Sequence, residues 1–194
     1  MKIFIIGAGP LGCIYSVSLT ELGFDVLLLA RGSRYNAIKK SGIELDNVLE
    51  KRRFTTQVNV IDYFPEGYNP DLILVIMRKN AAIQSLPALA QFNTQSPVLF
   101  LGNNIQGAAE YQNILGMERV LLGFAMAAGY FENQCIRCLY NREMHMIIGE
   151  PSWIITPRIR QIQEFFTNHG FPVDISPNID VYLKCHAAFI VPIA

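Results

Sequence analysis

The residues whose types and spacing first suggest chemistry form a glycine-rich turn near the N-terminus. They are Gly7-Ala8-Gly9-Pro10-Leu11-Gly12. The turn follows the apolar run 3–6, which predicts a buried strand, and precedes 13–22, where apolar residues recur at helical spacing. At such a turn, the free N–H groups and the dipole of the helix attract the phosphates of a dinucleotide. The three glycines would allow the tight turn, the close approach of a pyrophosphate and the packing of the helix against the strand.

An arginine occupies the position that decides which dinucleotide such a domain selects. Arg31 closely follows the second expected strand, 25–29. Domains that select NAD usually carry Asp or Glu there, whereas an arginine accommodates the 2′-phosphate of NADP and binds it through two hydrogen bonds. The sequence therefore predicts NADP(H) rather than NAD(H) as the cofactor. The same role stays open for Arg34, which lies where the next helix, 35–40, is expected to begin.

Two further expected strands end in polar clusters. The strand 71–76 is followed by Met77-Arg78-Lys79-Asn80, and the strand 98–101 leads into a loop that contains Asn104. Open α/β sheets bind ligands at the carboxyl ends of their strands, so both clusters are candidate binding residues. The amide of Asn104 suits a ribose hydroxyl or a substrate carbonyl. Asparagine is equally typical of turns, and the residues alone leave both interpretations open.

Strands and helices alternate along most of the chain, which is typical of a doubly wound parallel sheet. Further strands are expected at 71–76, 98–101 and 171–175, with small strands at 43–45 and 53–60. Further helices are expected at 108–115, 157–169 and 81–92, the last of which Pro87 can divide. The segment 119–128 is strand-like, and 135–140 and 143–149 are expected to pair as antiparallel strands around Asn141-Arg142. The predicted fold class is therefore α/β, with a doubly wound Rossmann-type parallel sheet.

The composition argues against several classes of partner. With 16 basic and 16 acidic side chains in 194 residues, the chain has no formal net charge, and thus no basic field for nucleic acid or a membrane surface. No run reaches the roughly 18 apolar residues of a membrane span. A cleaved leader would remove the glycine turn, so we expect a cytoplasmic protein. Cys135 and Cys138 form a single CxxC with no second pair or histidines at ligand spacing, so no metal site is predicted.

The character of the sequence changes at Asn178, which begins a helix-start pattern. We expect a dinucleotide-binding domain over 1–177 and the first helix of a second, helical domain over 178–194. Because the sequence ends in an apolar run without a helix stop signal, we expect that the chain is truncated or that a partner, such as a second copy in a homodimer, covers this face.

The chain resembles the N-terminal, NADP-binding part of the ketopantoate reductase (2-dehydropantoate 2-reductase) family. The resemblance rests on the glycine turn 7–12, Arg31, Met77-Arg78, Asn104, Ile147-Ile148-Gly149, Asn178-Ile179 and Tyr182-Leu183-Lys184. It implies that NADPH reduces a 2-keto acid to a 2-hydroxy acid, as in the formation of pantoate for coenzyme A synthesis. It also implies that Lys184 is the general acid, that Asn104 lines the nicotinamide and substrate side, and that Arg78 replaces a lysine near the adenosine end.

Three positions depart from the family pattern. Ile105 replaces a glycine in the loop, and Ala188 and Pro192 stand where asparagines are expected one and two turns after Lys184. A β-branched residue resists a positive φ, so the loop is expected to differ in shape. We therefore expect a chain that binds the cofactor and reduces substrate weakly or not at all. The alternatives are a diverged reductase for another keto acid and a non-catalytic NADP-binding or sensing domain.

Overall fold

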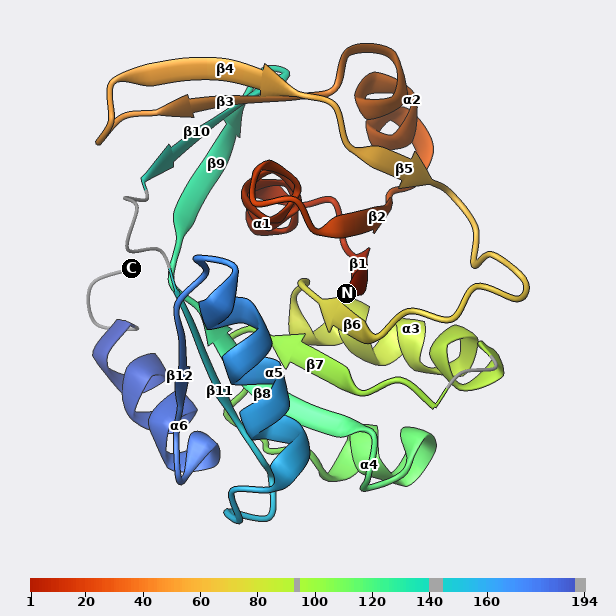
Figure 1. Ribbon diagram of the computed structural model, residues 1–194, viewed down its shortest axis with the longest axis vertical. Helices are drawn as coiled ribbons and strands as arrows, with labels where there is room; N and C mark the ends of the chain where they lie inside the picture. Colours follow the sequence, from red (N-terminus) through yellow and green to blue (C-terminus); the bar gives the residue numbers. More distant parts are fainter. Residues whose placement is uncertain (93–94, 140–144, 191–194) are drawn as a thin grey trace.

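The larger of two sheets forms the centre of the computed structural model, which describes residues 1–92, 95–139 and 145–190 (Figure 1). Its spatial order is β12-β11-β8-β7-β6-β1-β2-β5. In chain order the strands are β1 (Lys2–Ile6), β2 (Asp25–Leu29), β5 (Asn59–Ile61), β6 (Leu72–Val75), β7 (Val98–Leu101), β8 (Val120–Ala125), β11 (Met146–Gly149) and β12 (Val173–Ile175). The six neighbouring strands β8-β7-β6-β1-β2-β5 are parallel, and β11 runs antiparallel to β8. This arrangement confirms the predicted doubly wound Rossmann-type sheet.

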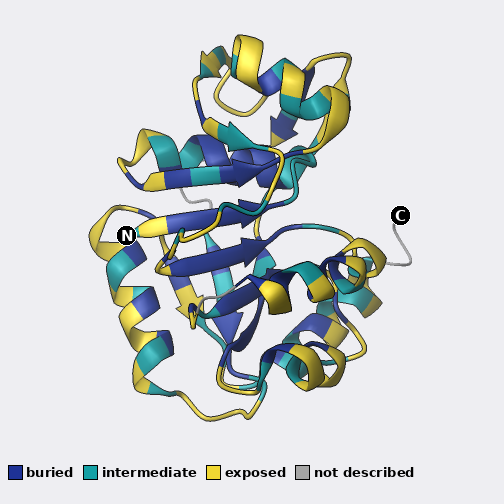
Figure 2. Ribbon diagram, turned by 90° about the vertical axis from the view of Figure 1, so that its right-hand side faces the viewer, coloured by how far each residue is buried: buried dark blue, intermediate teal, exposed yellow. Residues whose placement is uncertain are grey.

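Helices cover both faces of this sheet because successive residues of a buried strand point to opposite sides. The helices are α1 (Pro10–Glu21), α2 (Gly32–Ser41), α3 (Lys79–Gln91), α4 (Ala109–Leu115), α5 (Pro157–Asn168) and α6 (Ile179–Ile190). Ile3 and Ile5 of β1 pack in the apolar cluster of α1 and α5, whereas Phe4 and Ile6 pack in that of α3, α4 and α6. Figure 2 shows the strands as a buried layer between helices with exposed outer faces. The helix α3 continues through Pro87, so that proline does not divide it.

The second sheet covers the outer side of α1, which lies between the two sheets (Figure 1). Its spatial order is β4-β3-β10-β9. The strands are β3 (Ile43–Asn47), β4 (Arg52–Thr56), β9 (Ala128–Glu132) and β10 (Cys135–Leu139). Leu45 of β3 and Ile136 of β10 are buried in the same apolar cluster as Ile14 of α1. The small strands predicted after the second helix are therefore present, with β4 in this sheet and β5 at the edge of the large one.

The predicted pairing of 135–140 with 143–149 is wrong. The strand β10 pairs with β9 and with β3, whereas β11 lies in the large sheet between β8 and β12. A two-residue turn joins β9 to β10, with Asn133 at a φ of 58°, and asparagine tolerates this left-handed conformation. An alternating pattern identifies a strand but not its partner, which explains the error. Asn141 and Arg142 lie outside the described residues.

A buried ion pair fixes the segment between β11 and α5. Glu150 is almost fully buried, and its Oε2 lies 2.5 Å from the guanidinium of the half-buried Arg158. Thr156 also donates a hydrogen bond to Glu150, and Arg158 donates to the carbonyl oxygen of Val120 at 3.3 Å. Each polar group buried here thus has a partner, as burial of a charge requires. The pair attaches the first turn of α5 to the large sheet.

Candidate dinucleotide-binding site

A pocket of about 720 Å³ opens at the carboxyl ends of β1, β6 and β7. The strand-end loops supply most of its wall, because the carboxyl ends of parallel neighbours meet at one edge of the sheet. The lining residues are Gly7, Ala8, Gly9, Pro10, Leu11, Val75, Ile76, Met77, Arg78, Lys79, Ala82, Phe100, Leu101, Gly102, Asn103, Asn104, Tyr111 and Gly129. The structure thus brings together the glycine turn, Arg78 and Asn104, which the sequence placed at three separate strand ends.

The glycine turn is closely packed at two of its three glycines. Gly7 has a φ of +115°, and a Cβ atom there would lie 2.4 Å from the carbonyl oxygen of Ile76. A Cβ atom at Gly12 would lie only 1.8 Å from the carbonyl oxygen of Gly7. Gly9 differs, because a Cβ atom there would meet nothing within 4 Å. The turn therefore needs glycine at 7 and 12 to fold, and leaves open space over position 9.

The start of α1 presents unpaired backbone donors to this pocket. Gly9 is the N-cap residue and offers no side chain to cap the helix, and Pro10 fits the first turn because it needs no hydrogen-bond acceptor for its nitrogen. The first turn contains no acidic side chain. The N–H groups of this turn and the positive end of the helix dipole are therefore available to an anion.

The loop after β7 is held by its own asparagine. Asn104 is buried, its Oδ1 accepts a hydrogen bond from the N–H of Gln106 at 3.1 Å, and its Nδ2 donates to the carbonyl oxygen of Gly107 at 2.8 Å. These hydrogen bonds are those of a turn residue, one of the two interpretations that the sequence left open for Asn104. Asn104 also lines the pocket, as the other interpretation requires. Ile105 is not one of the described residues with a positive φ, and it is 54% exposed. The left-handed conformation occurs instead at Gly107, which has a φ of +75°.

Cations follow two strand ends of the large sheet, those of β6 and β2. Arg78 is exposed at the N-cap of α3, and the ammonium group of Lys79 donates a hydrogen bond to Oε1 of Gln106 in the loop after β7. Arg31 is exposed at the N-cap of α2, next to the carboxyl end of β2, and is not a lining residue. Within the described part of the chain, neither arginine has a carboxylate within 4 Å. Both guanidinium groups are therefore able to take an anion.

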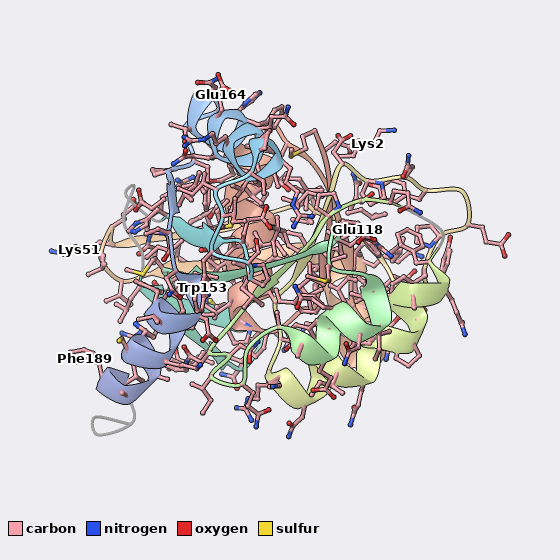
Figure 3. The ribbon with its side chains drawn as sticks, turned by 90° about the horizontal axis from the view of Figure 1, so that it is seen from below. Lys2, Lys51, Glu118, Trp153, Glu164 and Phe189 are labelled. Carbon is pink, nitrogen blue, oxygen red and sulfur yellow. The ribbon has the colours of Figure 1, made fainter. Side chains whose placement is uncertain are left out.

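Lys184 lies on α6, outside the lining of the pocket. Its ammonium group is 2.5 Å from Oδ2 of Asp180, one turn earlier. The other carboxylate oxygen of Asp180 lies 3.5 Å from the place that a Cβ atom would take at Gly107. The helix is docked by the fully buried Leu183, while Phe189 projects outward from it with 70% of its surface exposed (Figure 3). Asp180 thus lies close to the loop of Asn104, and its ion pair joins Lys184 to this end of α6.

Sequence reasoning missed several lining residues. Tyr111 of α4 stacks on Phe100 of β7 with ring centroids 3.9 Å apart, and burial raises the pKa of its hydroxyl to about 12, so it stays neutral. Gly129 reaches the pocket from β9, a strand of the other sheet. Aromatic residues in apolar runs are read as core, and no local signal shows that a distant strand will approach the glycine turn.

The histidines and cysteines contribute no metal site in the described residues. His145 lies 3.5 Å from Asp174, and the ring of His186 packs against Phe124 at a tilt of 48°, with centroids 4.0 Å apart. All four cysteines are free, and Cys185 alone among them is exposed. Across the described ranges, no helix combines the length and apolarity that crossing a bilayer would require. Ala188 is exposed one turn after Lys184, and Pro192 lies outside the described residues.

Comparison with known proteins identifies relatives of this chain. The sequence model described as ketopantoate reductase PanE/ApbA matches residues 3–153. The 2-dehydropantoate 2-reductase of Pyrococcus horikoshii is 30% identical over 179 residues, which are 92% of this chain and 57% of the relative. The chain therefore spans little more than half the length of that relative.

Solved structures share the fold. That of 2-dehydropantoate 2-reductase from Geobacter metallireducens matches with a TM-score of 0.79 and 24% identity, over 95% of this chain and 60% of that one. The ternary structure of D-mandelate dehydrogenase with NADH and anilino(oxo)acetate matches with a TM-score of 0.78 and 18% identity, over 91% of this chain and 57% of that one.

Proposed function

The chain belongs to the ketopantoate reductase family, and we propose that it is the cofactor-binding part of an NADPH-dependent 2-keto acid reductase. In this proposal residues 1–177 form the dinucleotide-binding domain, and 178–194 begin a helical substrate domain. The observation that carries the proposal is the open space over Gly9, in a pocket whose wall contains the start of α1. A pyrophosphate lying there would accept hydrogen bonds from the first turn of that helix.

The choice of NADPH over NADH rests on Arg31. Its guanidinium group stands next to the carboxyl end of β2 without a carboxylate partner in the described residues, so it is available to the 2′-phosphate of the adenosine ribose. Arg78 borders the pocket at the end of β6 and serves as the cation of the adenosine end. When bound, the nicotinamide supplies the hydride that reduces a keto group.

We propose Lys184 as the general acid of that reduction. The keto oxygen gains negative charge during the reaction, and an ammonium group both stabilises this charge and supplies a proton. The ion pair with Asp180 joins this ammonium group to the end of α6 that lies close to the loop of Asn104, which borders the pocket. Asn104 keeps this loop in shape and lines the nicotinamide side. The proposed substrate is a small 2-keto acid of the 2-dehydropantoate type.

The exposed Ala188 supports two further candidates, a reductase for a different keto acid and an NADP-binding domain without catalysis. An alanine one turn after Lys184 offers no hydrogen bond to a substrate where the family carries an asparagine. Incubation of the chain with NADPH and a panel of 2-keto acids, including 2-dehydropantoate, tests for catalysis. Turnover of one acid identifies the substrate and contradicts the non-catalytic domain, whereas NADPH binding without turnover fits both that domain and the cofactor-binding part of a reductase.

The cofactor assignment is tested by calorimetric titration of the chain with NADPH and with NADH. We expect NADPH to bind at least about tenfold more tightly, because a charge-assisted contact to phosphate contributes roughly 1.5–3 kcal/mol. The Arg31→Ala variant should lose this preference and keep its affinity for NADH. Equal affinities in the unmodified chain would contradict the role of Arg31, and absence of binding by either dinucleotide would contradict the proposed function.

A further inference from the structure

A second arginine, Arg34, lies on an aromatic ring beside the pocket. Its guanidinium carbon is 3.6 Å from the centroid of the Phe131 ring on β9. We propose that Arg34, held by Phe131, is a second cation for the 2′-phosphate of NADPH, acting together with Arg31. This inference rests on the proposed function and adds to it a residue that determines which dinucleotide is bound.

The position of Phe131 relates this arginine to the pocket. Along β9 the exposed and half-buried residues alternate, so Gly129 and Phe131 share the face that is turned toward α1. Gly129 lines the pocket, and Phe131 is the next residue on that face. The ring that holds Arg34 therefore belongs to a residue one strand repeat away from the wall of the pocket.

The thiol of Cys13 interacts with both the glycine turn and Arg34. Its Sγ donates a hydrogen bond to the carbonyl oxygen of Ala8, a residue of that turn, at 3.6 Å. Burial raises the pKa of this thiol to about 12, and the nearby Arg34 guanidinium acts in the opposite direction by favouring the thiolate. The positive charge of Arg34 thus acts electrostatically on Cys13, in the first turn of α1.

The charge of Arg34 is available to a ligand. Among the described residues no carboxylate lies within 4 Å of it, whereas Arg53 and Arg158 are paired with glutamates at 2.8 and 2.5 Å. A ring face orients a guanidinium without neutralising it. Arg31 is the N-cap residue of α2 and Arg34 is the third residue after it, and side chains at these two positions are neighbours at a helix start. Two guanidinium groups in this relation match a phosphate that carries close to two negative charges.

The alternative is a purely structural role, in which Arg34 only attaches α2 to β9. The chain contains a matched control for this alternative. Arg52 is stacked in the same way on Phe54, with its guanidinium carbon 4.0 Å from the ring centroid, but it lies on β4 and pairs with Glu21 at 3.9 Å. Removal of either arginine costs one stacking contact, and only removal of Arg34 takes a cation from the side of the pocket.

The test is calorimetric titration of the full chain with four ligands: NADPH, NADH, adenosine 2′,5′-bisphosphate and ADP. We expect Arg34→Ala to weaken the binding of NADPH and of the 2′,5′-bisphosphate about tenfold and to leave NADH and ADP unchanged. Arg34→Lys keeps the charge but not the planar guanidinium, so its affinity for NADPH should lie between those of the unmodified chain and Arg34→Ala. It also provides a variant to test if Arg34→Ala does not fold. Phe131→Leu should lower the affinity for the same two ligands by a smaller factor. Arg52→Ala should leave the affinity for all four ligands unchanged.

Three results would overturn the inference. An equal loss of affinity for NADPH and NADH in Arg34→Ala would show that the residue supports the fold or the shared part of the dinucleotide. No loss for NADPH in Arg34→Ala, together with a loss in Arg31→Ala, would refute the role of Arg34 and leave the proposed function standing. Absence of binding by every ligand to the unmodified chain would refute both.

Discussion

Two glycines of the same turn should respond to an added methyl group in opposite ways. At Gly12 the new Cβ atom would lie 1.8 Å from the carbonyl oxygen of Gly7 and 3.0 Å from its carbonyl carbon, whereas at Gly9 it would meet no atom within 4 Å. We therefore expect Gly12→Ala to lower the free energy of unfolding. We expect Gly9→Ala to preserve that free energy and to lower the affinity for the dinucleotide.

The magnitude for Gly12→Ala follows from two opposing effects. Alanine is favoured over glycine inside a helix by about 1 kcal/mol. Overpacking a tight interior costs about 1–3 kcal/mol, and the upper end or more applies here because the atom met is backbone. Gly7 cannot move away easily, since a Cβ atom at its own position would be 2.4 Å from the oxygen of Ile76. The net loss is about 2 kcal/mol, which lowers Tm by about 4–8 °C in a chain of this length.

We expect Gly9→Ala to change the free energy of unfolding little and the affinity for NADPH strongly. Gly9 has a φ of −72°, which any residue adopts. Alanine is a poorer N-cap residue than glycine, but it also restricts the unfolded chain, so the net change stays within about 1 kcal/mol. The methyl group would occupy the space over the turn. Loss of charge-assisted hydrogen bonds to a phosphate there corresponds to at least about a tenfold weaker affinity for NADPH.

Thermal unfolding followed by circular dichroism, together with NADPH titration, measures both effects. The packing argument fails if Gly12→Ala unfolds at the temperature of the unmodified chain, or if Gly9→Ala loses as much stability as Gly12→Ala. Unchanged NADPH affinity in Gly9→Ala would show that the phosphates do not lie over this turn.

Three further predictions concern the parts that hold the site in place. Glu150→Ala should cost about 3 kcal/mol in urea unfolding, because its arginine partner keeps a half-buried charge without a counterion; a cost below about 1 kcal/mol would contradict this. Leu183→Ala should cost about 2–5 kcal/mol and Val181→Ala, on the exposed side of α6, about 0.5 kcal/mol or less; equal costs would mean that α6 is not docked through Leu183. Burial raises the pKa of Cys138 to about 12, so at pH 8 a disulfide reagent should modify one thiol of the folded chain, at Cys185, and four after unfolding; early modification of a second thiol would refute the burial.

The parts of the fold that the sequence predicted are those with a local signal. The glycine turn between a strand and a helix needs only about fifteen residues to be recognised, and it lies where expected, between β1 and α1. The stretches that form β6, Leu72–Val75, and β7, Val98–Leu101, are continuous and apolar because both faces of the large sheet are covered. Because strands and helices alternate along most of the chain, the order of the elements was sufficient to predict the doubly wound sheet.

The parts that the sequence did not predict depend on contacts between distant segments. The strand β10 pairs with β3, about ninety positions earlier, and no pattern within either strand specifies that partner. Gly129 reaches the dinucleotide pocket only because this second sheet packs on α1. The hydrogen bond from Lys79 to Gln106 joins the start of α3 to the loop after β7, and such a pair becomes visible only when neighbouring strands are in register.

The replacement of glycine by Ile105 predicted an altered loop, and the contacts limit what that change does. The hydrogen bonds of the loop use Asn104 and Gln106, on either side of Ile105, whose own side chain is largely exposed. The left-handed turn that glycine would have permitted occurs two residues later, where the loop approaches Asp180, the partner of Lys184. The loop can therefore connect the dinucleotide pocket to the helix of Lys184 without a glycine at position 105, and the departure at this position does not by itself argue against catalysis.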